Sequence, residues 1–305
     1  YARVNMLSSV VRTPGLWAEE RTDRLPGSAK KCVLIMVTTL SASGLLSCHS
    51  PEDKKEDPHP VQALSPGSPL PFLERSLTGG AEHYRYTVSV PSMWHAQQTW
   101  PVIVFLHGLS VGRGGKRHNG HRFGEALRKV TPPVPVVIVF PHCPLPHLWH
   151  EPAMQTMVMQ ALEQTVQEFH GDKHRVYLVG HSLGGFGVWT LAMAHPGVFA
   201  ALVPIASSIH LPNELPCGVH PCDPATVNPY REVAQKIGRT PVWMFHGAQD
   251  RFVPVAEARE LSHTLRSLGA NVRYTEYAEL DHRCWKRTYA EPDLWPWLLD
   301  QHLEP

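Results

Sequence analysis

The stretch Val176-Tyr-Leu-Val-Gly-His-Ser-Leu-Gly-Gly-Phe186 decides the fold of this chain. An apolar run that favours β structure ends in a tight turn around Ser182, and a helix-compatible segment, Gly185 to Ala194, follows at once. A serine on a sharp turn between a strand and a helix is the setting of a nucleophile elbow. The alternative is a glycine-rich turn whose serine only caps the helix. The first interpretation requires a base, an acid and a second oxyanion donor from elsewhere in the chain.

Two features of the turn itself favour a nucleophile. Gly180 and Gly184 lack the Cβ atoms that would clash where strand and helix nearly touch. The backbone N–H of Leu183 lies at the positive end of the expected helix, so it can face a developing oxyanion.

Composition bounds the remaining possibilities. The 305 residues are 43% hydrophobic, which suffices for the core of one α/β domain. A net charge of +1 gives no indication of a nucleic-acid partner. The 20 histidines show no convincing metal-ligand spacing, since His142, His147 and His150 lie in a proline-rich loop without a carboxylate pattern. We therefore expect no metal and no organic cofactor.

The amino-terminal part divides into three segments by composition. Residues 1–29 show no periodicity, and we interpret them as non-native or as lying upstream of the true start. Residues 30–47 match a signal peptide, with Lys30-Lys31 followed by an apolar run too short to span a bilayer comfortably. Residues 48–71 are rich in proline, serine and charge, which is typical of a flexible linker. Residues 72–305 are expected to form the catalytic domain.

The end of the apolar run, Leu45-Leu-Ser-Cys48, resembles a bacterial lipobox, in which Cys48 becomes the lipidated first residue. An ordinary cleaved signal peptide with an incidental cysteine is the alternative, and a transmembrane anchor is disfavoured by the length of the run. We expect a bacterial protein exported as a periplasmic or cell-surface lipoprotein, anchored to the membrane through Cys48, or alternatively secreted. A monomer is favoured.

Strands and helices alternate in the expected catalytic domain. Strands are expected at residues 84–90, 101–106, 134–140, 175–179, 201–205, 241–245 and 272–277. Helices are expected at residues 154–169, 185–194, 230–237, 255–268 and 294–303. The first of these strands alternates like an edge strand. The alternation predicts an α/β fold with a mostly parallel central sheet, helices on both faces and no large lid.

Three further strand ends carry residues suited to chemistry, and sites in such sheets gather at the carboxyl ends of strands. After the second expected strand, a glycine-containing turn can present the N–H of Leu109 as a second oxyanion donor, while His107 supports the loop. Asp250 follows the strand at residues 241–245 and is either an acid that holds a histidine or a residue that shapes the turn. His282 follows the last strand and is either the general base or a surface histidine.

The order Ser182, Asp250, His282 agrees with the hydrolase order of serine, acid and histidine. Glu279 and Asp281 are rival acids, but they are so close to His282 in sequence that they would approach its ring nitrogen awkwardly. The combined order and placement favour a catalytic triad over a structural turn.

At these residues a family resemblance becomes plain. The elbow, the Pro241-Val-Trp-Met-Phe-His-Gly-Ala-Gln-Asp250 run and the histidine near Trp285 resemble the α/β-hydrolases labelled predicted peptidase or phospholipase/carboxylesterase. That group is similar to polyhydroxybutyrate-depolymerase-like and feruloyl-type esterases, and the resemblance extends from about Leu70 to the carboxyl terminus. It implies an α/β-hydrolase fold with Ser182 as nucleophile, Asp250 as acid, His282 as base, and Leu109 and Leu183 as oxyanion donors. Where relatives commonly have Gly-His, this chain has Asp281-His282.

The resemblance also places the turn at residues 141–144 beside a substrate cleft. We expect four residues to line that cleft: His107, Trp149, His181 and Trp285. For the tryptophans, ordinary core packing is the alternative.

The cysteines allow two bridges. In an exported protein Cys217 and Cys222 can form a disulfide, with two free thiols as the alternative. Cys143 and Cys284 lie in loops expected at one face, where a second bridge could form.

Taken together, the sequence predicts an exported serine carboxylesterase that hydrolyses short-chain, aryl or polymeric esters through an acyl-enzyme on Ser182. A serine peptidase of the same fold is the first alternative, because the same triad can cleave amides. A non-catalytic surface binding protein that kept the fold is the second.

Overall fold

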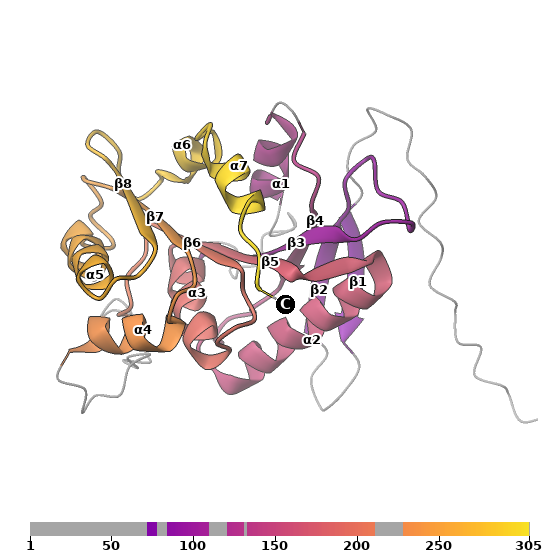
Figure 1. Ribbon diagram of the computed structural model, residues 1–305, viewed down its shortest axis with the longest axis horizontal. Coiled ribbons are helices and arrows are strands. Elements are labelled where there is room, and N and C mark those ends of the chain that lie inside the picture. The colour runs from indigo at the N-terminus through magenta and orange to yellow at the C-terminus, as the bar shows by residue number, and fades with distance from the viewer. Residues whose placement is uncertain (1–71, 78–83, 110–120, 131–132, 211–227, 305) are drawn as a thin grey trace, which may run out of the picture. The chain divides into compact units, whose positions relative to one another are not determined.

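A computed structural model describes residues 72–77, 84–109, 121–130, 133–210 and 228–304 of the chain. In this part, eight strands form one sheet in the order β1-β2-β4-β3-β5-β6-β7-β8 (Figure 1). The strands are β1 Phe72–Leu77, β2 Tyr84–Ser89, β3 Trp100–Leu106, β4 Val137–Pro141, β5 Gly171–His181, β6 Ala201–Ile205, β7 Val242–Gly247 and β8 Val272–Tyr277. Pairing is antiparallel from β1 to β2 and from β2 to β4, and parallel across the other six strands. The predicted mostly parallel sheet is confirmed.

Helices cover both faces of the sheet. They are α1 His121–Arg128, α2 Pro152–Phe169, α3 Leu183–Ala194, α4 Pro229–Ile237, α5 Val255–Ser267, α6 Trp285–Tyr289 and α7 Leu294–Leu299. Buried side chains of α2, α3, α4 and α5 pack in one core on one face. Those of α1, α6 and α7 pack in a second core on the opposite face, seen above the sheet in Figure 1.

The central strands supply both cores because successive side chains of a strand point to opposite faces. In β3, Val102 and Val104 belong to the core under α2 and α3, whereas Ile103 and Phe105 belong to the core under α1 and α6. All seven residues of β3 are buried. This explains why the sequence reads as a continuous apolar run rather than an alternation.

Some element bounds differ from the sequence prediction. The strand at residues 84–90 is not an edge strand, because β1 pairs along its outer side with Phe72 opposite Ser89. The strand β1 was not predicted, since its sequence mixes charged and apolar residues and it is only partly buried. Helices α1 and α6 were also missed, and α7 ends at Leu299 instead of continuing to Leu303. Elements this short offer too few turns for periodicity to be recognised.

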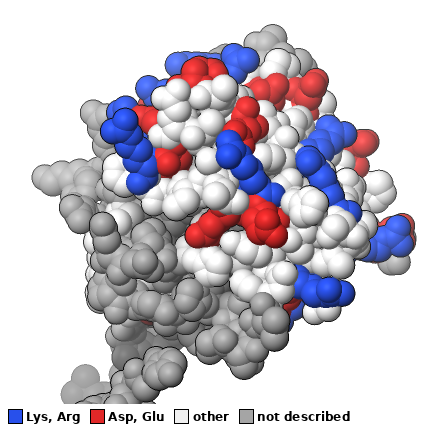
Figure 2. All heavy atoms as spheres, turned by 90° about the vertical axis from the view of Figure 1, so that its left-hand side faces the viewer, with Lys and Arg blue, Asp and Glu red and all other residues white. Residues whose placement is uncertain are grey.

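The edge strand β8 is protected by charge. Arg273 lies over the rings of Trp243 and Trp297, at 5.1 and 5.7 Å from their centroids. Glu276 forms an ion pair with Arg259 of α5 at 2.5 Å. Figure 2 shows Lys and Arg interspersed with Asp and Glu on the face that looks left in Figure 1. Charged side chains of this kind discourage the pairing of an edge strand with another chain.

Several predictions fall outside the described residues. They include the segments 1–29, 30–47 and 48–71, lipidation at Cys48 and the pair Cys217 and Cys222. The prediction that the fold has no large lid depends in part on residues 110–120 and 211–227, which are also outside the described part. Among the helices that the structure describes, none combines the length and apolarity needed to cross a membrane.

Candidate active site

Ser182 lies on a sharp turn between β5 and α3. Its backbone has φ 58° and ψ −121°, a left-handed conformation that L residues rarely adopt. A Cβ on Gly180 would overlap the carbonyl group of Gly184, and a Cβ on Gly184 would overlap that of Leu106. The two glycines therefore permit the close passage of strand, turn and helix that holds this serine in a strained conformation.

His282 connects this serine to an acid. Its Nε2 lies 2.8 Å from Ser182 Oγ, and its Nδ1 lies 2.7 Å from Asp250 Oδ2. The three residues follow β5, β7 and β8, whose carboxyl ends lie at the same edge of the sheet; β7 and β8 are adjacent, and β6 lies between β5 and β7. With Nδ1–H donating to the carboxylate, Nε2 is an acceptor for the serine hydroxyl.

Asp250 is held in its ionised form. Its side chain is 0% exposed. Burial alone would raise the pKa of this carboxyl, but hydrogen bonds from His246, His282 and the Val253 N–H outweigh it and hold the pKa well below its usual range. A buried carboxylate with these partners can stabilise a protonated His282 during a reaction.

The rival acids lie elsewhere. The Asp281 carboxylate accepts hydrogen bonds from the backbone N–H of Arg283 at 2.8 Å and from its guanidinium at 3.0 Å. Glu279 is exposed. Of the three candidate acids, the structure brings Asp250 to the histidine ring.

The two expected oxyanion donors belong to segments that lie next to Ser182. Leu183 is the first residue of α3, where the N–H groups of the first turn have no partner within the helix. The loop after β3 lies against the elbow, because a Cβ added at Gly108 would be 3.2 Å from the His181 carbonyl oxygen. Leu109 follows directly, so its backbone is also next to the serine.

His107 supports this loop, as its position predicted. Its Nδ1 donates to the Gly108 carbonyl at 2.9 Å, and its Nε2 accepts the Cys143 N–H at 3.1 Å. Burial lowers the pKa of His107 to about 4, so the ring is neutral at pH 7. The Trp149 indole donates to the His107 carbonyl at 3.0 Å. The prediction that His107 and Trp149 line the cleft is wrong, because they are 3% and 0% exposed.

His181 and Trp285 do lie beside the triad. His181 Nε2 donates to the His282 carbonyl at 3.0 Å, which fixes the backbone that carries the base. Burial also lowers the pKa of His181 to about 4. The Trp285 ring is half-buried and lies 6.5 Å from the His181 ring. Both residues therefore border the site from the side of α6.

His246 is a site residue that sequence reasoning missed. It is 1% exposed, and its Nε2 lies 3.1 Å from the Val253 carbonyl and 3.3 Å from Asp250 Oδ2. One N–H is thus shared between the acid and the loop that follows it. The spacing of four residues between His246 and Asp250, at the end of a buried strand, was the available signal.

Neither a disulfide nor a metal centre forms in the described residues. Cys143 and Cys284 are both buried free thiols, so the bridge considered between them is absent. His147 pairs with Glu151 at 2.6 Å. No group of three or more His, Cys, Asp or Glu side chains in the described part could hold a metal ion.

A hollow of about 280 Å³ opens beside the base. Its lining consists of Gln249, Arg251, Phe252, Asp281 and His282. Apart from the base, none of these residues was predicted to line the cleft. All of them belong to the loops that follow β7 and β8.

The serine, histidine and carboxylate can together perform nucleophilic acyl transfer. The chain also matches a family described as Putative esterase over residues 81–284. None of the curated proteins has a sequence that matches it.

Solved structures with a similar fold are hydrolases. A thermostable esterase is 26% identical, with a TM-score of 0.60, and the match covers 76% of this chain and 63% of that esterase. An acylaminoacyl peptidase from Pyrococcus horikoshii is 15% identical, with a TM-score of 0.60, covering 78% of this chain and 43% of the peptidase. The chain thus spans less than two thirds of the length of either protein.

A smaller relative in fold is covered completely. An S-formylglutathione hydrolase from Staphylococcus aureus is 15% identical, with a TM-score of 0.58, and the match covers 76% of this chain and 100% of that enzyme. These likenesses confirm the predicted α/β-hydrolase fold.

Proposed function

This chain belongs to the family described as Putative esterase and is a serine hydrolase, and we propose that its substrates are carboxylic esters of the short-chain, aryl or polymeric type. The observation that carries the proposal is the hydrogen-bonded series from Ser182 Oγ through both nitrogens of His282 to Asp250. The strained conformation of the serine supports it, because strain of this kind clusters at functional sites.

In the proposed reaction, His282 Nε2 takes the proton from Ser182 Oγ as that oxygen attacks the ester carbonyl carbon. The carbonyl oxygen becomes an oxyanion, and the N–H groups of Leu183 and Leu109 donate to it. Asp250 stabilises the imidazolium that forms. His282 then gives its proton to the departing alcohol oxygen as the C–O bond breaks, which leaves an acyl-enzyme. Water repeats the sequence and releases the acid and the free serine.

The nucleophile can be tested directly. We expect Ser182→Ala to abolish hydrolysis of p-nitrophenyl butyrate, with a loss of about 10⁶-fold in kcat. A fluorophosphonate probe should label the native chain at Ser182 and should leave the variant unlabelled. A variant that is folded by circular dichroism and retains full activity would contradict the assignment, and so would a native chain that resists the probe.

A peptidase of the same fold is the alternative substrate class. The same triad can attack amides, although an amide needs its leaving amine protonated before the C–N bond breaks. Parallel measurements of kcat/KM on p-nitrophenyl butyrate and on aminoacyl p-nitroanilides decide between the two. We expect the ester to be preferred, and higher kcat/KM on the anilides would reverse the assignment.

We also propose that the chain is exported and anchored through a lipid on Cys48, as the pattern of residues 30–48 predicts. Residues 30–305 can be expressed in a bacterium and the mass of the mature amino terminus measured. A diacylglyceryl-modified Cys48 is expected. An unmodified amino terminus beyond that residue would overturn the proposal. The same mass analysis without reduction tests the Cys217–Cys222 bridge.

A further inference from the structure

The hollow beside His282 has an unusual wall. Phe252 is 75% exposed, whereas the other exposed large hydrophobic residues of the described part, Met93, Leu145 and Leu268, are 41–48% exposed. The Phe252 ring lies 5.4 Å from the His282 ring, with 57° between their planes. An aromatic ring left in water beside the base forgoes the stabilisation that burial would give. It therefore presents apolar surface that a substrate can cover.

The acid of the triad holds the backbone that carries this ring. Asp250 Oδ1 accepts the backbone N–H of Phe252 at 2.8 Å and that of Val253 at 2.9 Å. The other oxygen of the same carboxylate accepts from His282. One buried side chain thus sets both the orientation of the base and the place of the Phe252 backbone relative to it. The backbone on this side of the hollow is therefore organised before substrate binds.

The direction of proton transfer indicates which part of the substrate lies next to Phe252. His282 Nε2 must approach the oxygen of the departing alcohol closely enough to protonate it. That alcohol therefore leaves along the side of the site where His282 and Phe252 form the hollow of about 280 Å³. The acyl carbon, in contrast, is held at Ser182 between the two oxyanion donors.

From this geometry we propose that the hollow is the subsite for the leaving alcohol, and that it selects esters of aromatic alcohols by contact with Phe252. The proposal rests on the esterase function above and deepens it. An aromatic group fits because ring pairs prefer tilted and offset contacts beyond simple burial.

The test compares esters that share one acyl group. Ethyl, benzyl and cyclohexylmethyl acetate form the same acetyl-enzyme, so differences in kcat/KM between them report on substrate binding and acylation, the stages in which the alcohol is still present. In Phe252→Ala we expect kcat/KM for benzyl acetate to fall about tenfold relative to that for ethyl acetate. The loss for cyclohexylmethyl acetate should be smaller, because an aliphatic ring lacks the aromatic contact.

Two matched variants serve as controls. Phe252→Tyr keeps the ring and should retain the benzyl preference. Leu268→Ala removes an exposed apolar side chain at the end of α5 and should leave all three rates unchanged. A second readout uses the reverse step: benzyl alcohol competing with water for the acetyl-enzyme should give about tenfold less transesterification in Phe252→Ala.

Each outcome bears on the proposal. An unchanged benzyl-to-ethyl ratio in Phe252→Ala would overturn it, and equal losses for the benzyl and cyclohexylmethyl esters would overturn the aromatic preference. A shift in preference between acetate and hexanoate esters of one alcohol would make the hollow an acyl site instead. None of these outcomes contradicts the esterase function, provided that Ser182→Ala is inactive. A native chain that hydrolyses none of these esters overturns the proposed function and this inference with it.

Discussion

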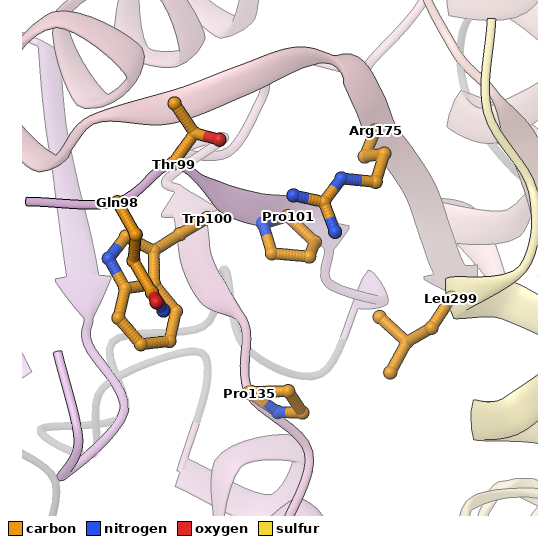
Figure 3. A pocket seen from close by; sticks show the side chains of 7 residues that line it. All are labelled: Gln98, Thr99, Trp100, Pro101, Pro135, Arg175 and Leu299. Atoms are coloured by element: carbon orange, nitrogen blue, oxygen red, sulfur yellow. The ribbon is translucent and has the colours of Figure 1, made fainter.

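Two hollows of similar volume lie at opposite edges of the sheet, and only one of them is lined by a residue of the catalytic triad, His282. The hollow beside the base measures about 280 Å³, and the other measures about 260 Å³. The second lies near the amino ends of β3, β4 and β5 and is shown in Figure 3. Its lining consists of Gln98, Thr99, Trp100, Pro101, Pro135, Arg175 and Leu299.

In the second hollow, the side chains of Arg175 and Trp100 already donate hydrogen bonds to other groups of the protein. Figure 3 shows the Arg175 guanidinium pointing toward Pro101. Its Nε donates to Asp172 at 2.7 Å. The Trp100 indole donates to the His95 carbonyl at 3.0 Å. Volume therefore does not distinguish a site from a gap between elements.

The difference follows from the direction of the strands. In a parallel sheet all carboxyl ends meet at one edge, where the loops into the helices begin and the first N–H groups of each helix are unpaired. Ser182, Asp250 and His282 reach that edge because each follows a parallel strand. The opposite edge receives strand starts and the end of α7, which offer no comparable donors. The following predictions test this contrast, beginning with the largest effect.

The acid at the carboxyl edge should be indispensable. We expect Asp250→Asn to reduce kcat for p-nitrophenyl butyrate about 10⁴-fold, because the amide no longer fixes the tautomer of His282 or stabilises its protonated form. The matched control is Asp281→Asn, which changes a carboxylate one residue from the base that is bonded to Arg283. If Asp281→Asn were the more damaging change, the assignment of the acid would be wrong.

The carboxyl edge should also be the acid-sensitive one. The pKa of His107 is lowered by burial to about 4, so between pH 6.5 and 4 the unfolded chain binds a proton that the folded chain does not. Stability should therefore fall as the pH falls through this window, by about 3 kcal/mol for this residue. Urea unfolding of the native chain and of His107→Gln at pH 7 and 4.5 measures it. The variant should show a shallower dependence, and an equal dependence would contradict the expectation.

At the amino edge of the sheet, stability should depend on pH in a lower range. Burial would raise the pKa of Asp172, but hydrogen bonds from Arg175 and the His174 N–H hold it below its usual value. The stability that this carboxylate contributes is present above its ordinary pKa of about 4 and is lost only at lower pH. The two edges can thus be separated by pH.

His246 should have a smaller effect on rate. His246→Leu removes the N–H shared between Asp250 and the Val253 carbonyl, and we expect kcat to fall about tenfold with KM unchanged. His246→Gln keeps an amide donor near the position of Nε2 and should restore most of the rate. A loss of equal size in both variants would indicate that the residue contributes by packing alone.

The smallest effect is expected at the hollow of Figure 3. Arg175→Ala removes its only charged side chain, and we expect kcat and KM to be unchanged. The unfolding free energy should fall by about 1 kcal/mol or less, because the pair with Asp172 is partly exposed. Steady-state kinetics and urea unfolding check both statements. A change in kcat/KM greater than threefold would show that this edge influences the reaction and would break the contrast.

The sequence predicted the elements whose pattern is local and strong. The bounds of β6 and β8 agree with the prediction. β6 is an apolar run, and β8 is rich in β-branched and aromatic residues, which favour strands. The strand β1 was not predicted, because a partly exposed segment with charged residues becomes a strand only by pairing with β2. Pairing is a contact between distant residues, and a local pattern does not contain it.

The site was predictable to the extent that it depends on chain order. The order of serine, acid and histidine, each at the end of a strand, predicted Ser182, Asp250 and His282, and the structure brings these three together. The placement of Trp149 was not predictable, because the same residue can line a cleft or fill a core. Its burial follows from how the loop before α2 packs on His107.

The sequence by itself determined the alternation of strands and helices, the glycines that admit the elbow and the order of the three reactive residues. These features depend on side-chain chemistry and on spacing along the chain. Only the tertiary structure decided that His246 shares its proton with the Asp250 carboxylate and that Phe252 stands exposed beside the base. Each of these is a contact whose distance is set by the packing of separate loops on one sheet edge.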